Sequence, residues 1–281
     1  MNEPIILKGK QIAADIIDEQ KNIIQTLKKS PCLGILLIGN RPDSKLYIKM
    51  KKKQCEIAGI NYLLIELEEN STKKDILDSL QILNDNQKIT AILIQLPLPS
   101  HINEREILNH IKKEKDVEGF HNINVGNLTL NNNYIAPCTP LGCIEILKRY
   151  NISIEGKHVV IIGKSNCVGM PLSILCLHEN ATVTTCHLMT SNLTSHTKNA
   201  DVIMVACGCP KLIKKDNIKE GCIIIDIGIN KIKEENKEII VGDVDYADVI
   251  NKVSAITPVP GGIGPMTIAM LIKNIVTLST N

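Results

Sequence analysis

Large aromatic side chains are almost absent from this 281-residue chain, which has no Trp, one Phe and five Tyr. Its core must therefore be built from aliphatic residues. Hydrophobic residues make up 44% of the chain and charged residues 22%, which is typical of a globular protein with a substantial core. The length is sufficient for two domains of ordinary size.

Signals for membranes and nucleic acids are also missing. The first ten residues have neither the apolar core of a signal peptide nor a basic amphipathic pattern, and no apolar run approaches about 18 residues. The net charge is only +2, and the lysine clusters alternate with acids instead of forming a basic stripe. We therefore expect a cytoplasmic protein that binds neither membranes nor nucleic acids.

The ten cysteines lack the spacing of a metal site or a disulfide framework. Cys207-Gly-Cys209 is one residue shorter than the usual zinc or redox pair, and the others are scattered through apparent strands and helices. We interpret all ten as reduced thiols and expect no metal site.

One helix separates a single lysine from its lysine neighbours. It follows a turn, and Asp43 or Ser44 is expected to cap it. At about 100° per residue, Lys51 shares a face with Tyr47, one turn away. The other lysines of the helix fall on the opposite side: Lys49, Lys52 and Lys53. A lysine on a semi-apolar face either snorkels to solvent or transfers protons, because burial disfavours the ammonium form.

The first half of the chain alternates apolar runs with segments of helical periodicity. Strands are expected at 33–38, 62–67 and 89–95, and helices at 8–29, 44–58, 73–84 and 103–112. Such alternation indicates parallel βαβ units, whose sites lie at the carboxyl ends of the strands. Gln95 occupies such an end, either as part of a site or as a simple hydrogen-bonding residue. The Asn-rich stretch 122–136 is expected to be an irregular connection.

The second half begins with a strand, a turn and a helix. The strand at 159–162 runs into the turn 163–171, whose backbone N–H groups at the helix start suit a dinucleotide pyrophosphate. Ser165 replaces the second glycine of the usual fingerprint, so a plain strand-to-helix turn stays an alternative. Further strands are expected at 182–186, 202–206 and 223–227, and an apolar helix at 266–278.

The choice of dinucleotide depends on the strand that ends at Cys186. An acid at this end binds the ribose 2′-hydroxyl in NAD enzymes, and no acid is present. Lys164 offers a cation nearby. The sequence therefore favours NADP, with NAD not excluded.

Taken in order, these segments resemble the bifunctional methylenetetrahydrofolate dehydrogenase/methenyltetrahydrofolate cyclohydrolase family. The resemblance covers nearly the whole chain. The matching segments are Ser44-x-x-Tyr47-x-x-x-Lys51, Gln95-Leu-Pro-Leu-Pro99, Asp116-Val-Glu-Gly-Phe120, Pro137-Cys-Thr-Pro140, Gly163-Lys-Ser-x-x-Val-Gly169, Asp226-Ile-Gly-Ile-Asn230, Gly242-Asp243-Val244 and Pro258-Val-Pro-Gly-Gly-Ile-Gly-Pro-Met-Thr267.

The resemblance implies two α/β domains with a cleft between them, the second being a Rossmann-type dinucleotide-binding domain. Residues 1–139 form the folate-binding catalytic domain, completed by the C-terminal helix 266–281, and residues 140–265 form the NADP-binding domain. The implied enzyme oxidises 5,10-methylenetetrahydrofolate to the 5,10-methenyl form with NADP. It then hydrolyses the product to 10-formyltetrahydrofolate, in one-carbon metabolism and purine biosynthesis. A homodimer formed through the dinucleotide domain is implied as well.

The resemblance also implies roles for individual residues. Lys51 is the catalytic lysine, Tyr47 stacks on the folate and orients it, and Gln95 tunes the lysine. The substrate-binding residues are Ser44, Asp116, Glu118, Pro260, Gly261 and Gly262. The dinucleotide-binding residues are Gly163, Lys164, Ser165 and Ile229.

Three positions depart from the family pattern. Glu118 replaces an aspartate, Lys164 replaces the arginine common in NADP-using members, and Leu188-Met189 replaces the Ser-Arg of a stretch that helps to bind the 2′-phosphate. Three other functions stay open as alternatives. They are a cyclohydrolase with a weakened dehydrogenase, a folate- or dinucleotide-binding protein without turnover, and an unrelated Rossmann dehydrogenase.

Overall fold

A computed structural model describes residues 3–234 and 237–280 of the chain. The chain divides into two compact units. One unit comprises residues 1–13 and 139–267, and the other comprises residues 14–138 and 268–281. Both contain parallel strands joined by helices, so the expected α/β class is confirmed.

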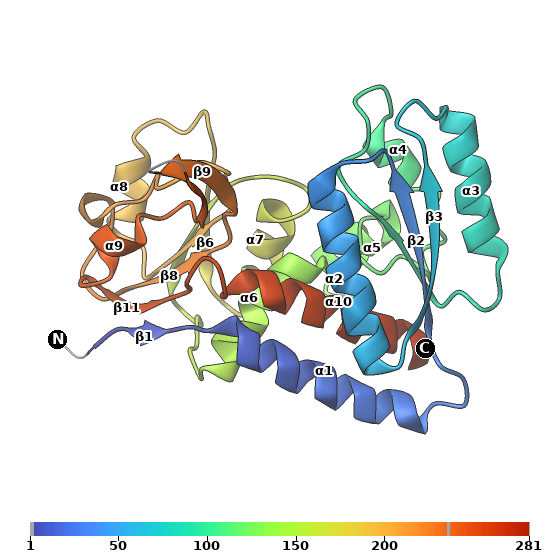
Figure 1. Ribbon diagram of the computed structural model, residues 1–281. Coiled ribbons are helices and arrows are strands. Elements are labelled where there is room, and N and C mark those ends of the chain that lie inside the picture. The colour runs from blue at the N-terminus through green and yellow to red at the C-terminus, as the bar shows by residue number, and fades with distance from the viewer. Residues whose placement is uncertain (1–2, 235–236, 281) are drawn as a thin grey trace. The chain divides into compact units, whose positions relative to one another are not determined.

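The unit of residues 14–138 is built on a parallel sheet with the order β3-β2-β4. The central strand is β2 (Cys32–Ile38), flanked by β3 (Asn61–Leu67) and β4 (Ala91–Ile94). Helix α2 (Pro42–Ala58) connects β2 to β3, and α3 (Lys73–Asp85) connects β3 to β4. The two crossovers run in opposite directions along the sheet, from β2 to β3 and from β3 past β2 to β4, and right-handed connections then place α2 and α3 on opposite sides of the strands (Figure 1).

The start of α2 differs from the prediction. The helix begins at Pro42, with Arg41 in the N-cap position and no side-chain cap, so the assignment of Asp43 or Ser44 as the cap was wrong. Proline suits the first helical position because the missing N–H would have no partner there. The Asp43 carboxylate instead accepts from the Arg41 guanidinium and from the Ser44 N–H. The helix ends at Gly59, as expected, in a left-handed conformation with φ of 81°.

A short helix, α5 (Asn122–Thr129), occupies the stretch that the sequence indicated to be irregular. That prediction was wrong because side chains fix the helix start. The His121 ring accepts from the Ile123 N–H, and Asn124 donates to the Asp116 carboxylate at 2.9 Å. The predicted helix at 103–112 is also shorter than expected. The other helical segments in and around this unit are α1 (Gly9–Thr26) and α4 (Glu104–Leu108).

The other unit is built on a six-stranded parallel sheet with the order β1-β11-β8-β7-β5-β6. The order reverses beside β5, because β6 lies on one side of it and β7 on the other. Ligands of such sheets bind at the carboxyl ends of the strands near this reversal. The strands are β1 (Ile5–Ile6), β5 (His158–Ile162), β6 (Thr182–Cys186), β7 (Val202–Val205), β8 (Cys222–Asp226) and β11 (Val253–Ile256).

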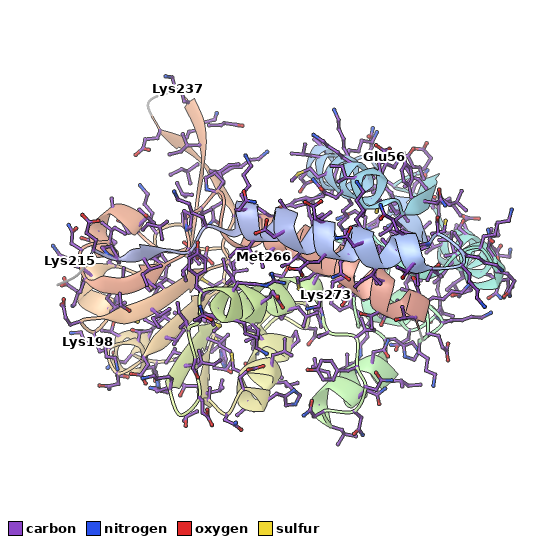
Figure 2. The ribbon with its side chains drawn as sticks, turned by 90° about the horizontal axis from the view of Figure 1, so that it is seen from below. Glu56, Lys198, Lys215, Lys237, Met266 and Lys273 are labelled. Carbon is purple, nitrogen blue, oxygen red and sulfur yellow. The ribbon has the colours of Figure 1, made fainter. Side chains whose placement is uncertain are left out.

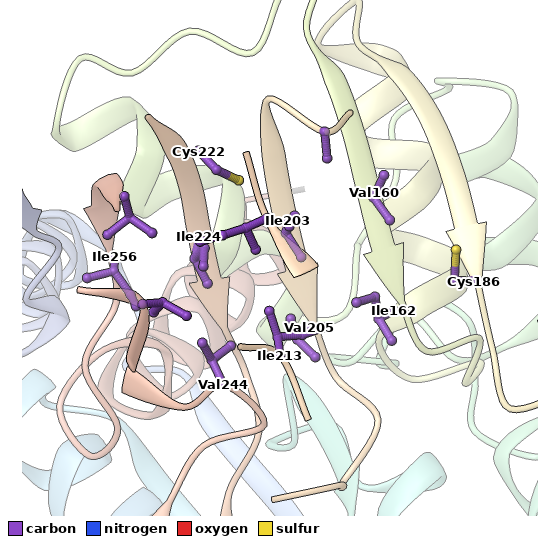
Figure 3. Packing of buried hydrophobic residues seen from close by; sticks show 14 residues of the cluster. Val160, Ile162, Cys186, Ile203, Val205, Ile213, Cys222, Ile224, Val244 and Ile256 are labelled. Carbon is purple, nitrogen blue, oxygen red and sulfur yellow. The ribbon is translucent and has the colours of Figure 1, made fainter. Parts of the chain in front are cut away.

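Aliphatic residues fill the core of this sheet, as the shortage of aromatic residues required. Val160, Ile203 and Ile224 on neighbouring strands have no exposed surface and lie together (Figure 3). A separate antiparallel hairpin pairs β9 (Asn230–Glu234) with β10 (Lys237–Val241). The helices of this unit include α7 (Gly169–His178), α8 (Leu193–Thr197) and α9 (Tyr246–Val249), and the 3₁₀ turn η1 is Lys215–Asn217.

The first thirteen residues group with residues 139–267, although the sequence analysis placed them with the first domain. The cause is strand β1, in which Ile5 pairs with Ala255 of β11. Further along lies Met266, which is labelled in Figure 2. It packs against Gly9 and Gly142, and a Cβ on either glycine would crowd its side chain. The chain passes between the units within α1, at the start of α6 (Cys138–Arg149) and within α10 (Ile263–Thr280).

Helix α10 is long and apolar enough to cross a membrane by length and composition alone, which the sequence analysis did not anticipate. Its contacts are those of a core helix. Asn274 is buried and donates to the carbonyl oxygens of Val117 and Ala136, at 2.9 and 3.0 Å. Ile272 and Ile275 of the same helix have no exposed surface.

Candidate active site

Lys51 is a buried lysine in the third turn of α2, with 8% of its surface exposed. It shares the buried face of the helix with Ser44, Ile48 and Cys55. Its Nζ donates to the Gln95 Oε1 atom at 3.0 Å. The separation of Lys51 from the other lysines of the helix is therefore confirmed, and the alternative in which it snorkels to solvent is not what the structure shows.

Gln95 is held from several sides at the carboxyl end of β4. Its backbone N–H donates to the Leu36 carbonyl of β2, and its Nε2 donates to the Leu96 carbonyl. These bonds direct the Oε1 atom toward Lys51, which leaves the amide little freedom to turn. The structure thus brings together two residues that are 44 positions apart in the sequence.

Two acids follow β4 in the same unit, and they have different surroundings. Asp116 is buried, and its Oδ2 accepts from the His121 N–H and from Asn124 Nδ2, so this carboxylate stabilises the start of α5. Glu118 is half-buried, and burial raises the pKa of its carboxyl. The positive charge of Lys51 lowers that pKa, whereas the charge of Asp116 adds to the increase. The charges of Lys51 and Glu118 therefore interact.

The thiols near Lys51 stay protonated. Burial raises the pKa of the Cys55 thiol to about 12 although Lys51 opposes this effect, and burial also raises the pKa of Cys138. All ten cysteines are free in this structure. In the described part of the chain, no three His, Cys, Asp or Glu side chains are grouped so that they would hold a metal ion.

Tyr47 and Ser44 complete the expected residues of α2. Tyr47 is 37% exposed, so part of its ring is available for contact, and burial of the remainder raises the pKa of its hydroxyl. Ser44 is almost fully buried. Tyr47 lies one helical turn before Lys51, as the spacing predicted.

In the unit of residues 139–267, the turn after β5 brings backbone atoms unusually close together. Gly163 has φ of 125°, and a Cβ there would overlap the Ala206 carbonyl oxygen of the loop after β7. A Cβ on Gly169 would overlap the Gly163 carbonyl oxygen. Glycine is therefore required at both positions, and the cradle that results suits the close approach of a pyrophosphate.

Lys164, Ser165 and Asn166 of this turn are exposed. The Ser165 hydroxyl accepts from the Val168 N–H at 3.1 Å, which supports the start of α7. In the loop after β8, Ile229 is 51% exposed. The four residues that the sequence analysis assigned to the dinucleotide thus lie in loops at the carboxyl edge of one sheet.

The turn after β6 presents apolar side chains. His187 N–H donates to Thr190 Oγ1, and Met189 N–H donates to His187 Nδ1, which closes a tight turn. Leu188 and Met189 at its tip are 98% and 81% exposed. Residues Cys186 to Thr190 contain neither an acid that would repel a 2′-phosphate nor an arginine that would bind it.

The glycine-rich loop before α10 binds its own unit. Gly261 has φ of 109°, and its carbonyl accepts from the Gly9 N–H at 2.9 Å. Gly262 is buried and donates to the Pro258 carbonyl, whereas Pro260 is exposed. The expected contact of Pro260, Gly261 and Gly262 with substrate stays a prediction.

Two further carboxylates were missed as functional candidates. Asp226 and Asp243 are 3% and 0% exposed, and both lie at the carboxyl edge of the six-stranded sheet. Their motifs, Asp226-Ile-Gly-Ile-Asn230 and Gly242-Asp243-Val244, were recognised as part of the resemblance, but the side chains received no role. The available signals were an acid at the end of a buried strand, two residues before Gly228, and an acid directly after Gly242.

Comparison with known proteins supplies the family. The model of the tetrahydrofolate dehydrogenase/cyclohydrolase catalytic domain matches residues 7–118, and that of the family's NAD(P)-binding domain matches residues 137–281. The chain belongs to this family. The expectation drawn from the ordered motifs is thereby confirmed.

Similar proteins are known from bacteria and eukaryotes. The chain is 47% identical to the bifunctional protein FolD of Campylobacter hominis, over 98% of this chain and 97% of that protein. The crystal structure of the bifunctional dehydrogenase/cyclohydrolase FolD from Campylobacter jejuni has a TM-score of 0.95 and 48% identity, covering 98% of each chain. The Trypanosoma brucei enzyme, determined with NADP and an inhibitor, has a TM-score of 0.95 and 32% identity, covering 100% of this chain and 98% of that one.

Proposed function

We propose that this protein oxidises 5,10-methylenetetrahydrofolate to 5,10-methenyltetrahydrofolate with NADP and then hydrolyses the product to 10-formyltetrahydrofolate. These steps belong to one-carbon metabolism and provide formyl groups for purine biosynthesis. The observation that carries the proposal is the buried hydrogen bond between Lys51 and Gln95, at 3.0 Å, in a chain of the tetrahydrofolate dehydrogenase/cyclohydrolase family.

Hydrolysis of the methenyl cation requires a proton carrier. Water adds to the methenyl carbon and loses one proton, which leaves a hydroxyl on that carbon. The hydroxyl then loses its proton as the C=O bond forms, and the bond from the carbon to N5 breaks as N5 gains a proton, so that one proton is released overall. The amine of Lys51, in its neutral form, accepts the first proton and returns one to N5. Because Gln95 Oε1 holds Lys51 in place, the amine need not search for its position during each transfer.

The substrate-binding residues of α2 and of the segment after β4 support this step. The partly exposed ring of Tyr47 offers a stacking surface for the folate, one turn from Lys51. Glu118 supplies a carboxylate that balances the charge of Lys51, and Asp116 fixes the adjacent backbone through the start of α5. Ser44 is assigned to the same group because it lies on the buried face with Lys51.

For the oxidation, the protein mainly orients its substrates. Gly163 keeps the turn after β5 narrow, and Lys164, Ser165 and Ile229 line the edge of the sheet where the dinucleotide is bound. When bound, the nicotinamide supplies the acceptor for the hydride that leaves the methylene carbon. Lys164 is the cation assigned to the 2′-phosphate of NADP.

The proposal assigns folate chemistry to residues 1–139 with the C-terminal helix, and dinucleotide binding to residues 140–265. We also propose a homodimer that works in the cytoplasm. Light scattering coupled to size-exclusion chromatography tests the dimer, and fractionation of the source cells tests the location.

A spectroscopic assay with methylenetetrahydrofolate and each dinucleotide tests the function. We expect absorbance from reduced dinucleotide and methenyltetrahydrofolate, followed by decay of the methenyl signal as water adds. Decay of added methenyltetrahydrofolate without reduction of either dinucleotide would instead identify a cyclohydrolase that has lost its dehydrogenase. Absence of both signals would leave a binding protein without turnover.

A further inference from the structure

The carboxylate of Asp243 connects two loops that are distant in sequence. Its Oδ2 accepts from the backbone N–H groups of Cys207 and Gly208, at 2.7 and 3.0 Å. Its Oδ1 accepts from the side-chain amide of Asn230 at 2.8 Å. One fully buried side chain thus holds the loop after β7 and the end of the loop after β8.

Asp243 is itself held by the second buried acid. The Oδ1 of Asp226 accepts from the N–H groups of Gly228 and Asp243, and its Oδ2 accepts from the Val244 N–H, each at 3.0 Å. Burial, with a smaller contribution from the charge of Asp243, raises the pKa of Asp226 to about 6. Asp226 therefore fixes the backbone at Asp243, and this directs the Asp243 side chain toward the two loops.

Two glycines make room for this arrangement. A Cβ on Gly228 would overlap the Asp243 carboxylate, and a Cβ on Gly242 would overlap the Asp226 carboxylate. Both acids therefore lie directly against main chain. Burial of a carboxylate is costly unless hydrogen bonds satisfy it, and backbone and side-chain N–H groups provide those bonds at this edge.

The bond from Cys207 N–H has a consequence at the dinucleotide turn. A trans peptide is planar, and its N–H and C=O groups point in opposite directions. The peptide joining Ala206 to Cys207 directs its N–H to Asp243 and its carbonyl oxygen to Gly163, where a Cβ would overlap that oxygen. Asp243 therefore fixes the orientation of the peptide that packs on the turn after β5.

The loop that follows this peptide has little other support. Cys207, Gly208 and Cys209 are exposed, and Gly208 has φ of 68°. Since apolar contacts do not order an exposed loop, its conformation depends on the hydrogen bonds of its backbone. Asn230, the first residue of β9, directly follows Ile229 of the loop after β8, a residue assigned to the dinucleotide.

We propose that Asp243 is a positioning residue for dinucleotide binding, which keeps the loops after β7 and β8 in the conformation that receives the dinucleotide. It acts through Cys207, Gly208 and Asn230 and does not itself touch the ligand. The inference rests on the proposed function, because it takes the carboxyl edge of the six-stranded sheet as the dinucleotide site.

The test compares Asp243→Ala with Asp243→Asn. Alanine removes every acceptor, whereas asparagine keeps one oxygen for the two backbone N–H groups, and the Asn230 amide can turn to accept from the new NH₂ group. We expect Asp243→Ala to raise the Kd for NADP about 30-fold or more, and Asp243→Asn to raise it only about threefold. Titration calorimetry measures both.

The cyclohydrolase activity separates positioning from folding, because hydrolysis of added methenyltetrahydrofolate requires no dinucleotide. We expect this activity to remain within about twofold of wild type in both variants. Hydrogen exchange at the amides of residues 207–209 should accelerate in Asp243→Ala. The matched control is Asp216→Asn, an exposed acid of the same unit, which should change neither Kd nor exchange.

If Asp243→Ala does not fold, Asn230→Ala removes one of the three donors and tests the same connection. It should raise the Kd for NADP several-fold with unchanged hydrolysis, and a Kd within twofold of wild type would then overturn the inference.

Each outcome decides for or against the role of Asp243. If the wild-type protein binds NADP and Asp243→Ala binds it with the same Kd, this inference is overturned and the proposed function is not. Parallel losses of hydrolysis and of NADP binding would also overturn it, by showing a general effect on folding. A wild-type protein that binds neither dinucleotide would overturn the proposed function, and the inference with it.

Discussion

The carboxyl edges of the two parallel sheets provide different kinds of chemistry. In the sheet β3-β2-β4, Gln95 follows a strand and binds the buried side chain of Lys51, with Glu118 near enough to respond to its charge. In the six-stranded sheet, the turn after β5 has two glycines, Gly163 and Gly169, packed on backbone, and its polar tip is exposed. One edge depends on side chains that carry charge, and the other on main chain held in a fixed shape.

The difference follows from what each edge is proposed to do. Moving a proton requires an ionisable group in a defined position, which burial and hydrogen bonds supply. Binding a pyrophosphate requires closely spaced N–H groups, which any sequence provides if glycines let the chains approach. We therefore expect substitutions at the edge of the sheet β3-β2-β4 to change proton transfer. Substitutions at the edge of the six-stranded sheet should instead change the backbone conformation that binds the dinucleotide.

The largest expected effect is that of Lys51→Met on hydrolysis. Methionine fills a similar volume on the buried face of α2 and removes the proton carrier. We expect the rate of methenyltetrahydrofolate hydrolysis to fall at least 100-fold, while the Kd for NADP stays within about twofold. The decay of methenyl absorbance measures the rate.

Lys49→Met, on the exposed side of the same helix, is the matched control and should hydrolyse at the wild-type rate. A Lys51→Met variant that keeps hydrolysis within about tenfold of wild type, roughly 1.4 kcal/mol in the barrier, would exclude Lys51 as the essential proton carrier.

A change of backbone conformation at the edge of the six-stranded sheet should weaken NADP binding and leave hydrolysis intact. In Gly163→Ala, the new Cβ overlaps the Ala206 carbonyl oxygen, so the turn after β5 must open. We expect the Kd for NADP to rise about 30-fold, on the order of 2 kcal/mol, with hydrolysis unchanged. Titration calorimetry and the hydrolysis assay measure the two effects on one preparation.

Gly156→Ala is the matched control for backbone strain. Gly156 also has positive φ, at 68°, but a Cβ there meets nothing within 4 Å. It should lower the stability of the protein without weakening NADP binding. Equal losses of binding in the two variants would attribute the effect to strain and would contradict the role of the Ala206 contact.

We expect the pH dependence of hydrolysis to arise from ionisable groups at the edge of the sheet β3-β2-β4. Burial raises the pKa of Glu118, so this carboxyl gains its proton at a higher pH than an ordinary glutamate as the solution is acidified. Its charge, which balances Lys51, is lost below that pKa. We expect Glu118→Gln to remove the corresponding acidic limb from the pH profile of hydrolysis, changing the rate at its acidic end by about tenfold.

The pH profile of NADP binding in Glu118→Gln is the internal comparison and should match that of wild type. A pH profile of hydrolysis that keeps the same acidic limb in Glu118→Gln would assign that limb to a different group.

The sequence predicted those parts of the fold and site that depend on local pattern. The alternation of strands and helices, the end of α2 at Gly59 and the burial of Lys51 all follow from periodicity or from a single special residue. Gln95 was identified because a strand end is visible in the sequence. Each of these signals lies within a few residues of the feature that it predicts.

The parts that were missed depend on distant contacts. Strand β1 has two residues, and the first thirteen residues join their unit through its pairing with β11 and through the bond from Gly9 N–H to the Gly261 carbonyl. The helix α5 depends on Asp116, and the loop after β7 depends on Asp243, 36 positions from Cys207. Nothing in the pattern around an aspartate states which backbone N–H groups it will accept from.

The smallest expected effect tests whether a single side chain contributes to dinucleotide selection at the carboxyl edge of the six-stranded sheet. Lys164 is exposed at the turn after β5, and the apolar Leu188 and Met189 stand at the tip of the turn after β6. A lysine provides a point charge without the paired donors of an arginine, and an exposed ion contact is worth on the order of 1 kcal/mol. We therefore expect NADP to be preferred over NAD by less than about tenfold, with the preference weakening as salt is added.

Lys164→Ala should remove most of this preference and leave kcat/KM with NAD nearly unchanged, because NAD has no 2′-phosphate for the lysine to contact. Lys157→Ala, a substitution of another exposed lysine of the same unit, is the control and should leave the preference as it is. The ratio of kcat/KM for the two dinucleotides, measured at two salt concentrations, gives the result. If the wild-type enzyme prefers NAD, the assignment of Lys164 to the 2′-phosphate is wrong. The conformation of the turn would then select the dinucleotide without a contribution from the lysine charge.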